Sequence, residues 1–251
     1  MSLSVIVITR DEESSLRDCL ASVAWADEIV VVDSGSADAT VEIAREFTEH
    51  VYIHDWPGFG VQKNRALSYA TGEWVLSLDA DERVTPGLRG EIEDAMREAK
   101  YPAYDMPRLS NYCGRFMRHS GWYPDYVTRL FRRGSAHFSN DVVHERLLPD
   151  GSVGRLNTAL LHYAFDDIEE VLRKLDQYST AGAQKMHGCG RKASLTGAVL
   201  RGAWSFFRTY VLRGGFLDGR EGFMLAVSNA EGTYYRYLKL MLLNRKQGTS
   251  G

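Results

Sequence analysis

The chain has 251 residues, of which 44% are apolar and 25% charged, and its formal net charge at pH 7 is -3. This ordinary globular composition argues against disorder and fits one large α/β domain or a domain with an appendage. The three cysteines lie far apart without metal-ligand spacing, which argues against a disulfide framework or a structural zinc site. No apolar run has transmembrane length, and the N-terminal one reads as a first strand rather than a signal peptide.

The charge is distributed unevenly. Between Lys185 and Lys246 there are eleven basic residues and only three acidic ones, so the rest of the chain is strongly acidic. The basic segment is also rich in aromatic residues. We therefore expect an acidic front and a basic, aromatic-rich rear.

The first hundred residues alternate between short apolar runs and amphipathic segments, a pattern typical of parallel strands joined by helical crossovers. The second apolar run, EIVVV, is nearly all Val and Ile, as in a strand covered on both faces. Strands are predicted at 3–9, 28–32, 50–54 and 72–78. Helices are predicted at 12–26, 41–48, 60–70 and 84–99, the last with Pro86 in its first turn.

Beyond residue 100 the pattern changes. Short β-like runs between turns predict a smaller mixed sheet over the first half, within 101–165. Residues 166–246 are predicted to be mostly helical and 247–251 to be a disordered tail. The expected fold class is α/β, with a mostly parallel central sheet flanked by helices and a helical C-terminal extension.

Three acidic residues, Asp79, Asp81 and Glu82, end the fourth predicted strand. Such a cluster costs free energy unless a cation, a basic partner or solvent relieves the repulsion. Alternate side chains of a strand share a face, so Asp79 and Asp81 can point the same way. At the carboxyl edge of a parallel sheet they suit a divalent ion, Mg²⁺ or Mn²⁺, that is also bound by substrate phosphates. A solvated turn with helix-capping acids is the alternative.

Asp33 ends the second predicted strand, again at the edge where open α/β sheets bind ligands. Its carboxylate could accept hydrogen bonds from a nucleobase or ribose, and Ser34, Gly35 and Ser36 permit close backbone approach. An ordinary βα turn capped by Ser36 or Asp38 is the alternative. Dinucleotide and P-loop readings have little support, because the sequence has neither GxGxxG nor GxxxxGK.

A third polar group, Lys63, Asn64 and Arg65, opens the helix predicted at 60–70. These side chains could meet phosphates, or they could simply be surface charge.

Seven segments resemble, in order, the inverting GT-A-fold family 2 glycosyltransferases, and within them the bacterial lipopolysaccharide-core branch of glucosyltransferase type. They are SVIVITRDEE, ADEIVVVDSGSADAT, GFGVQKNRAL, GEWVLSLDADERV, WYPDYVTRLFRR, VHE and GFLDGREGF. The first half is specific to the superfamily, and the middle and rear indicate the branch. The resemblance implies a GT-A fold in which 1–100 bind a nucleotide sugar and 101–165 form the acceptor side of the same domain.

The resemblance also implies roles for single residues. Asp33 would meet the uracil, and Asp79 and Asp81 would be the DxD pair, with Asp81 as direct metal ligand. The metal would neutralise the departing nucleoside diphosphate. The nucleotide-sugar site would comprise Thr9, Asp11, Glu12, Asp33, Ser34, Gly35, Lys63, Asn64 and Asp79.

Inversion needs a base that takes a proton from the acceptor hydroxyl as it attacks the anomeric carbon. Family 2 enzymes generally place an acidic pair after the acceptor segment, and here that place holds His144 and Glu145. We expect Glu145 to be the base, with Asp125 and Asp141 as rivals. A structural hydrogen-bonded pair is the alternative role for His144 and Glu145.

The segment WYPDYVTRLFRR offers groups for an acceptor. Trp122 and Tyr123 are stacking surfaces for a sugar, and its arginines, Arg129, Arg132 and Arg133, are candidate phosphate partners. Part of the segment alternates as a strand does. The QxxRW motif common in family 2 does not occur, so the diphosphate contact falls to another basic residue, such as Arg129, Lys63 or a rear arginine.

The rear segment LTGAVLRGAWSFFRTYVLRGGFLDG interleaves aromatic residues with Arg201, Arg208 and Arg213. This fits a helix in a membrane interface that is attracted to anionic head groups, and TYYRYLKLMLLNRK adds a second basic amphipathic helix. Aromatics packed on the domain, with arginines facing water, are the alternative. Nucleic acid is not expected, because no RNA-recognition signature accompanies the basic residues.

The leading hypothesis is an enzyme that transfers a hexose, glucose from UDP-glucose, to a lipid-linked saccharide such as the lipopolysaccharide inner core. It would act at the cytoplasmic face of the inner membrane. A sugar-phosphate nucleotidyltransferase would use similar acids but needs a glycine-rich loop after the first strand, and TRDEES is not one. A transferase for another surface polysaccharide and a non-catalytic carbohydrate-binding membrane protein stay open, as does the oligomeric state.

Overall fold

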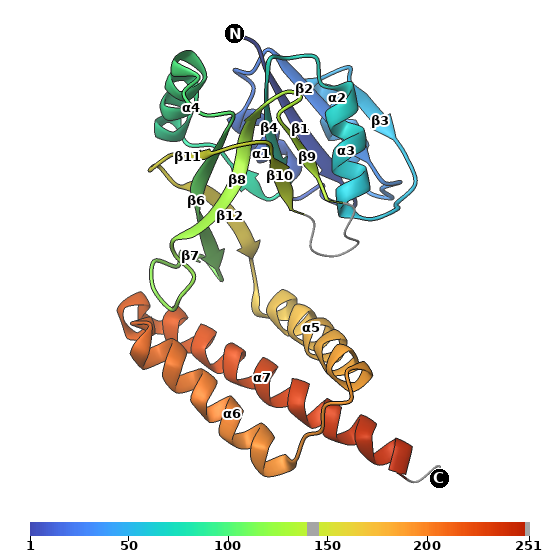
Figure 1. The fold of residues 1–251 in the computed structure, drawn as a ribbon, viewed down its shortest axis with the longest axis vertical. Helices are drawn as coiled ribbons and strands as arrows, with labels where there is room; N and C mark the ends of the chain where they lie inside the picture. The colour runs from blue at the N-terminus through green and yellow to red at the C-terminus, as the bar shows by residue number, and fades with distance from the viewer. Residues whose placement is uncertain (140–145, 249–251) are drawn as a thin grey trace. The chain divides into compact units, whose positions relative to one another are not determined.

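The computed structural model of the chain describes residues 1–139 and 146–248. Its contacts divide the chain into two compact units. The first unit comprises Met1–Arg108 and Asp125–His162, and the second comprises Leu109–Pro124 and Tyr163–Gly251. The first unit holds helices α1 to α4 and most of the strands, and the second holds the long helices α5 to α7 (Figure 1).

The elements of the first hundred residues follow the predicted order. The strands are β1 (Leu3–Thr9), β2 (Glu28–Asp33), β3 (Val51–Ile53), β4 (Trp74–Asp79) and β5 (Glu82–Arg83). The helices are α1 (Leu16–Ser22), α2 (Thr40–Phe47), α3 (Phe59–Tyr69) and α4 (Pro86–Glu98). Helix α1 is shorter than predicted, because the backbone N–H groups of Ser15 and Leu16 both donate to the Glu12 carbonyl in a turn before it.

Most of the later strands join the same sheet. The later strands are β6 (Ala103–Tyr112), β7 (Arg115–Phe116), β8 (Asp125–Arg132), β9 (Ala136–Phe138), β10 (Leu147–Pro149), β11 (Val153–Arg155) and β12 (Leu160–Phe165). Strands β3, β2, β1 and β4 lie side by side and run parallel, whereas β8 pairs antiparallel with β4 and β6 pairs antiparallel with β8.

The central sheet, predicted to be mostly parallel, is therefore mixed. The prediction of a separate smaller sheet within 101–165 is wrong. Among the strands of the described residues, only β9 and β10 pair apart from the main sheet, as a two-stranded ribbon. The physical reason is that β4 is fully buried at Val75 and Leu76. A buried apolar strand cannot leave one row of backbone hydrogen-bonding groups without a partner.

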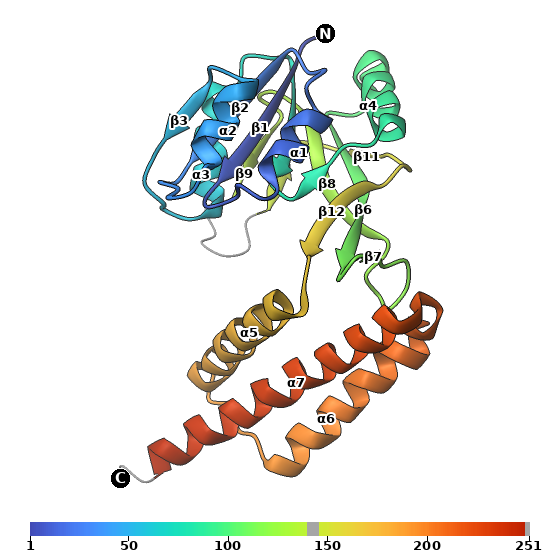
Figure 2. The same ribbon diagram turned by 180° about the vertical axis from the view of Figure 1, so that it is seen from behind.

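The parallel strands are covered on both faces, as the composition of β2 predicts. Val30, Val31 and Val32 have no exposed surface. Val31 packs in a cluster with apolar residues of α1, α2 and α4, and its neighbours Val30 and Val32 pack in a second cluster with residues of α3. Figure 2 shows α1 in front of the sheet.

The second unit confirms the predicted helical C-terminal extension. Helices α5 (Ile168–Gly188), α6 (Leu195–Phe207) and α7 (Gly219–Gly248) are joined by short turns, including a π-helical turn (Arg208–Leu212) and a 3₁₀ turn (Gly215–Asp218). The side chain of Asp167 caps α5 by accepting from Glu170 N, and Ser194 caps α6 by accepting from Gly197 N. None of the helices in the described residues has the length and apolarity needed to cross a bilayer.

A buried carboxylate joins the middle of the chain to these helices. Asp218 is 1% exposed and accepts hydrogen bonds from the backbone N–H groups of Arg118 (3.2 Å) and His119 (2.9 Å) and from Ser120 Oγ (3.2 Å). The loop before Trp122 is thereby fixed to the 3₁₀ turn that precedes α7.

A substitution at Gly72 tests how closely the backbone before β4 approaches β1. A Cβ atom at Gly72 would lie 2.7 Å from both the backbone N and Oγ of Ser4. Gly72→Ala is therefore expected to lower the free energy of unfolding by about 1–3 kcal/mol, measured by urea denaturation. The control is Gly90→Ala within α4, where a Cβ meets nothing within 4 Å. It should raise the free energy of unfolding by about 0.5–1 kcal/mol. Equal midpoints for both variants would contradict this account.

Candidate functional site

The parallel register brings polar residues from three strands to one edge of the sheet. Thr9 lies opposite Asp33 in the β1–β2 pair, and Ile8 lies opposite Asp79 in the β1–β4 pair. Since β1 runs between β2 and β4, Thr9, Asp33 and Asp79 all stand at the carboxyl ends of neighbouring strands. This is the edge at which open α/β sheets bind ligands.

Basic side chains relieve the repulsion within the acid cluster. Lys63 Nζ lies 2.8 Å from Asp79 Oδ1, and the Arg129 guanidinium bonds to Asp79 Oδ2 and, at 2.6 Å, to Glu82 Oε1. Arg108 lies 3.5 Å from the same Glu82 oxygen. Glu82 is fully buried, and Lys63 and Arg129 are 2% and 7% exposed. The cluster is thus a buried ion network joining α3, β4, β5, β6 and β8.

The network fixes the charge of its members. Burial would raise the pKa of Asp79, but the charges of Arg129 and Lys63 outweigh it and hold that pKa well below its ordinary value. Burial raises the pKa of Glu82, against the opposing effect of Arg129. Arg129, flanked by both acids, has a pKa raised above its ordinary value despite its burial. Asp79 therefore stays ionised and balanced by fixed cations.

Asp81 has a different environment. Its Oδ2 lies 3.2 Å from His162 Nε2, while its Oδ1 is buried without a hydrogen-bond partner among the residues that the structure describes. An orphaned buried carboxylate oxygen beside an imidazole nitrogen fits a divalent cation that takes its other ligands from a diphosphate and water. Within the described ranges, no group of three or more His, Cys, Asp or Glu side chains could hold a metal.

His162 is the residue that the sequence analysis missed. It lies on β12, which pairs antiparallel with β5 so that His162 stands opposite Glu82. Nothing in the local pattern LLHYAF signals this, because the pairing joins segments far apart in the chain. Only the sheet topology reveals it.

Asp33 organises the turn after β2. It is fully buried, and its carboxylate accepts four hydrogen bonds: from Thr9 Oγ1 (3.0 Å), from the backbone N–H groups of Gly35 and Ser36 (both 2.8 Å), and from Ser36 Oγ. Gly35 has φ +79°, and a Cβ there would meet nothing within 4 Å. The turn is therefore held by hydrogen bonds to Asp33, and the space beside Gly35 is open.

The loop after β1 is tied to this turn. Asp11, at φ +55°, donates its backbone N–H to Ser36 Oγ (2.8 Å), and its Oδ1 accepts from Ala37 N (2.8 Å). The backbone N–H of Glu12 donates to Thr40 Oγ1 (2.8 Å). The two loops to which the resemblance assigns nucleotide binding are therefore bonded into one surface.

Ser34 and Asn64 make packing contacts near this surface. Ser34 Oγ accepts from Gln62 Nε2 (2.9 Å). The Asn64 amide accepts from Phe138 N (3.0 Å) and donates to Phe138 O (2.8 Å), so it holds β9 against α3. Both side chains position the elements around the acid cluster.

The residues expected on the acceptor side are divided between the two units. Arg129 has its guanidinium engaged by the two acids described above. Trp122 and Tyr123 belong to the second unit. Arg132 bonds to Glu73 Oε1 (2.9 Å) and pairs with Trp74, so it lies at the opposite end of β4 from Asp79. Arg133 follows it and donates to the Gly72 carbonyl (2.8 Å), so neither arginine lies at the cluster.

Of the candidate bases, Asp125 is described and the others are not. Asp125 Oδ2 accepts from Arg108 Nη2 (2.7 Å) and Nε (3.1 Å), which links it through Arg108 to Glu82. His144, Glu145 and the rival Asp141 lie outside the described residues.

Comparison with known proteins identifies the family of the chain. The model of glycosyl transferase family 2 matches residues 4–152. An uncharacterized glycosyltransferase of Rickettsia conorii is 30% identical over 257 residues, which cover 95% of this chain and 89% of that protein. The lipopolysaccharide core biosynthesis glycosyltransferase LpsC of Rhizobium meliloti is 28% identical, with 92% and 88% covered.

Solved structures show the same fold. Residues 1–349 of S. aureus TarS, in complex with UDP, superpose with a TM-score of 0.52 at 17% identity, over 98% of this chain and 92% of TarS. The corresponding complex with UDP-GlcNAc gives a TM-score of 0.50 at 16% identity, over 99% and 92%. With a family match over more than half of its length and a GT-A sheet, this chain belongs to glycosyl transferase family 2 and is a glycosyltransferase.

Proposed function

We propose that the enzyme transfers a hexose, with inversion, from a UDP-sugar to a lipid-linked saccharide, with UDP-glucose as donor and the lipopolysaccharide inner core as acceptor. The observation that carries the proposal is the polar edge formed by Thr9, Asp33, Asp79 and Asp81. LpsC is named for lipopolysaccharide core biosynthesis, and TarS binds UDP and UDP-GlcNAc. The name of LpsC supports the lipopolysaccharide acceptor, and the TarS complexes support a uridine-nucleotide donor. The choice of glucose rests on the resemblance of the sequence.

The uridine would bind the two joined loops. Two of the four bonds to Asp33 come from backbone N–H groups of its own turn, but the Ser36 hydroxyl can rotate away. A uracil imide N–H could then replace that hydroxyl on the buried carboxylate. Gly35 leaves the space above the turn open for the nucleotide.

Asp81 and His162 would hold the divalent ion, Mg²⁺ or Mn²⁺. When bound, the ion supplies positive charge that stabilises the leaving diphosphate. Asp79 has a separate task in this proposal: it keeps Lys63 and Arg129 fixed at the edge of the sheet. A preorganised positive group costs no rearrangement when negative charge develops on the leaving group.

Glu145 is the proposed base, assisted by His144, and Asp125 is the rival. Both bonds from Arg108 go to Asp125 Oδ2, so the carboxylate is held in place by one oxygen. The base would take the acceptor proton on the face of the sugar opposite the diphosphate.

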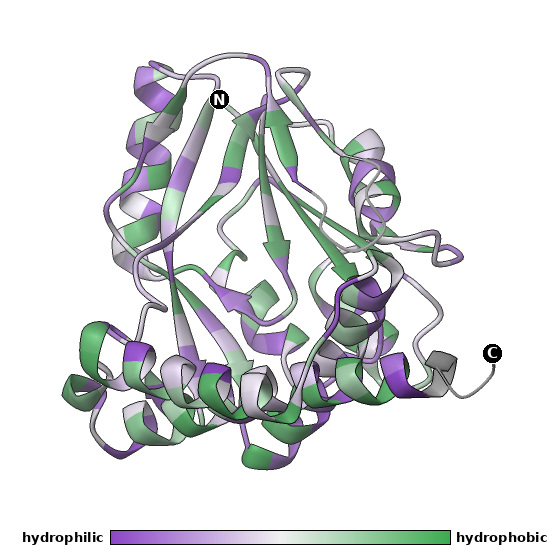
Figure 3. Ribbon diagram, turned by 60° about the horizontal axis from the view of Figure 1, so that its bottom comes forward, coloured by the Kyte–Doolittle hydropathy of each residue, from purple (hydrophilic) through white to green (hydrophobic). Residues whose placement is uncertain are grey.

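We also propose that α6 and the turn after it lie on an anionic membrane surface, at the cytoplasmic face of the inner membrane. Four apolar residues at helical spacing form an exposed stripe: Leu200, Trp204, Phe207 and Val211, which are 65%, 57%, 43% and 44% exposed. The exposed Arg201, which follows Leu200 in the chain, supplies charge that anionic head groups attract. Figure 3 shows apolar and polar residues interleaved along the helices.

Removal of Asp81 tests the donor site. Asp81→Ala and His162→Ala are expected to weaken Mn²⁺-dependent binding of UDP by about tenfold or more, because a charged contact worth roughly 1.5–3 kcal/mol is lost. Calorimetry with UDP, UDP-glucose and GDP-mannose, with and without Mn²⁺, measures this. Asp94→Ala on the surface of α4 is the matched control and should bind as the wild type does. Metal-dependent binding that survives in Asp81→Ala contradicts the proposed site.

The base is tested by isosteric amides. Glu145→Gln should lower the transfer rate by about 10²- to 10⁴-fold with UDP-glucose binding intact, because general base catalysis contributes that much. Transfer is measured as UDP release in the presence of a lipopolysaccharide-core acceptor. If Asp125→Asn abolishes transfer and Glu145→Gln does not, the assignment of the base is wrong.

The membrane proposal is tested on the exposed stripe. The double variant Leu200→Gln/Trp204→Gln should bind phosphatidylglycerol vesicles about tenfold or more weakly in a sedimentation assay, because burying such a side chain contributes about 1.5–3 kcal/mol. The control Leu172→Gln changes a residue of α5 that is 51% exposed. Binding that is equal in the double variant and the control, or equal on phosphatidylcholine vesicles, refutes membrane docking through α6.

A further inference from the structure

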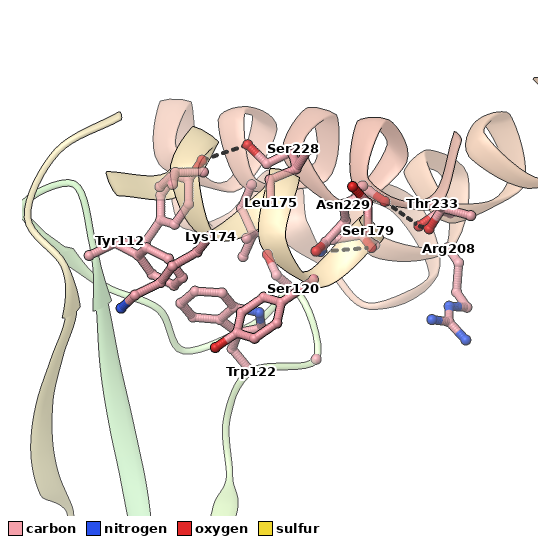
Figure 4. A pocket seen from close by; sticks show the side chains of 18 of the residues that line it. Tyr112, Ser120, Trp122, Lys174, Leu175, Ser179, Arg208, Ser228, Asn229 and Thr233 are labelled. Carbon is pink, nitrogen blue, oxygen red and sulfur yellow. Dashed lines mark hydrogen bonds between the residues drawn. The ribbon is translucent and has the colours of Figure 1, made fainter. Parts of the chain in front are cut away.

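The second unit contains a cavity of about 450 Å³ that is distinct in composition from the acid cluster. Its volume falls in the range of small-molecule sites, roughly 300–1,000 Å³. All of its lining residues belong to the second unit. They come from the Tyr112–Trp122 segment, the end of β12, helices α5, α6 and α7, and the turn after α6. Figure 4 shows Tyr112 and Trp122 at one end of the cavity and Arg208 at the other.

The cavity is lined by several cations. Its basic residues are Lys174, Arg208, Arg213 and Arg236, and no Asp or Glu of the described part of the chain is among the lining residues. Lys174 is compensated, because its Nζ lies 2.8 Å from Glu170 Oε1. The three arginines form no ion pair with any residue in the described ranges. The cavity therefore carries uncompensated positive charge.

Arg236 shows that this charge is built into the fold. Its Nε is buried and has no hydrogen-bond partner among the described residues. The side chain lies against Gly182 of α5, where a Cβ would come within 2.9 Å of Nε and 3.0 Å of Cδ. A donor held in this way, with nothing to donate to, indicates a ligand that supplies an acceptor.

The remaining lining residues suit a sugar ring. Trp122 packs edge-on against Tyr112 and tilted against Phe165, with ring centroids 5.7 and 6.0 Å from its own. Ser205 and Thr233 present hydroxyl groups 3.3 Å apart, and Asn229 adds an amide. Aromatic faces combined with a few hydroxyl and amide groups are what a site for a polyhydroxylated ring requires.

We infer that this cavity binds a phosphorylated saccharide, with Arg236 and its neighbouring arginines on the phosphate and Trp122 on the sugar. A phosphomonoester carries about 1.5–2 negative charges and three acceptor oxygens, which can engage more than one guanidinium. The identification of this ligand with part of the acceptor rests on the proposed transferase function. Asp218 serves the site indirectly, because it fixes the loop that carries Trp122.

The experiment is calorimetric titration of the full chain with glucose 1-phosphate, while saturating UDP and Mn²⁺ occupy the donor site. Arg236→Gln and Arg208→Gln should each weaken binding by about tenfold or more, because a charge-assisted contact is removed. Arg220→Gln is the control, since this arginine is 92% exposed and does not line the cavity. Binding that is equal in all three variants overturns the assignment.

A second pair of variants tests the position of the Arg236 side chain without changing its charge. Gly182→Ala displaces Arg236 without removing it, whereas Gly188→Ala in the same helix meets nothing within 4 Å. Affinity should fall only in Gly182→Ala, although alanine favours the helix at both positions. Equal affinities in these two variants overturn the role of Arg236. Circular dichroism confirms that each variant is folded.

Other probes decide the chemistry of the ligand. Inorganic phosphate and glucose should each bind more weakly than glucose 1-phosphate, and phosphatidylglycerol vesicles should not compete with it. Phosphate that binds as tightly as the sugar phosphate, or competing vesicles, overturn the saccharide assignment. A protein that binds UDP but not glucose 1-phosphate refutes the cavity and leaves the donor site standing. One that binds glucose 1-phosphate but not UDP supports the cavity and refutes the proposed transferase.

Discussion

The ion pairs of Arg129 with Asp79 and Glu82 join β8, β4 and β5 in the core of the first unit. These three residues come from β8, β4 and β5, and Glu82 is completely buried. Removing one partner from a buried ion pair leaves an uncompensated charge, which costs about 3–5 kcal/mol. The acids of β4 and β5 can therefore be buried only if β8 lies beside β4. The mixed sheet and the network depend on each other.

The two aspartates in DADE therefore have different roles. Asp79 forms ion pairs with Lys63 and Arg129 and so holds two cations at the edge of the sheet. Asp81 faces His162 and keeps one buried oxygen without a partner in the described residues. A pattern of two alternating carboxylates thus gives one positioning residue and one proposed metal ligand. The distinction comes from their neighbours, since the two side chains are chemically identical.

The helical unit carries an exposed apolar stripe and a separate cationic cavity. The stripe lies on α6 and the turn after it, whereas Arg236 of α7 lines the cavity and lies against α5. A surface of exposed apolar residues beside an arginine suits a lipid interface, and an arginine-lined cavity with aromatic walls suits a phosphorylated sugar. Both features follow from one basic, aromatic-rich sequence, which the fold distributes over different faces.

The sequence by itself determined the parallel strands of the first half, the carboxyl-edge placement of Asp33, Asp79 and Asp81, and the helical extension. These follow from local periodicity and from the rule that strands end at one edge of a parallel sheet. Tertiary structure alone decided that β8 joins β4, that Arg129 enters the acid cluster, that His162 meets Asp81, and that Trp122 lines a cavity with Arg236. Each of these contacts joins segments far apart in the chain. These contacts form because they bury apolar groups and neutralise charge over a whole unit. A local sequence pattern does not predict them.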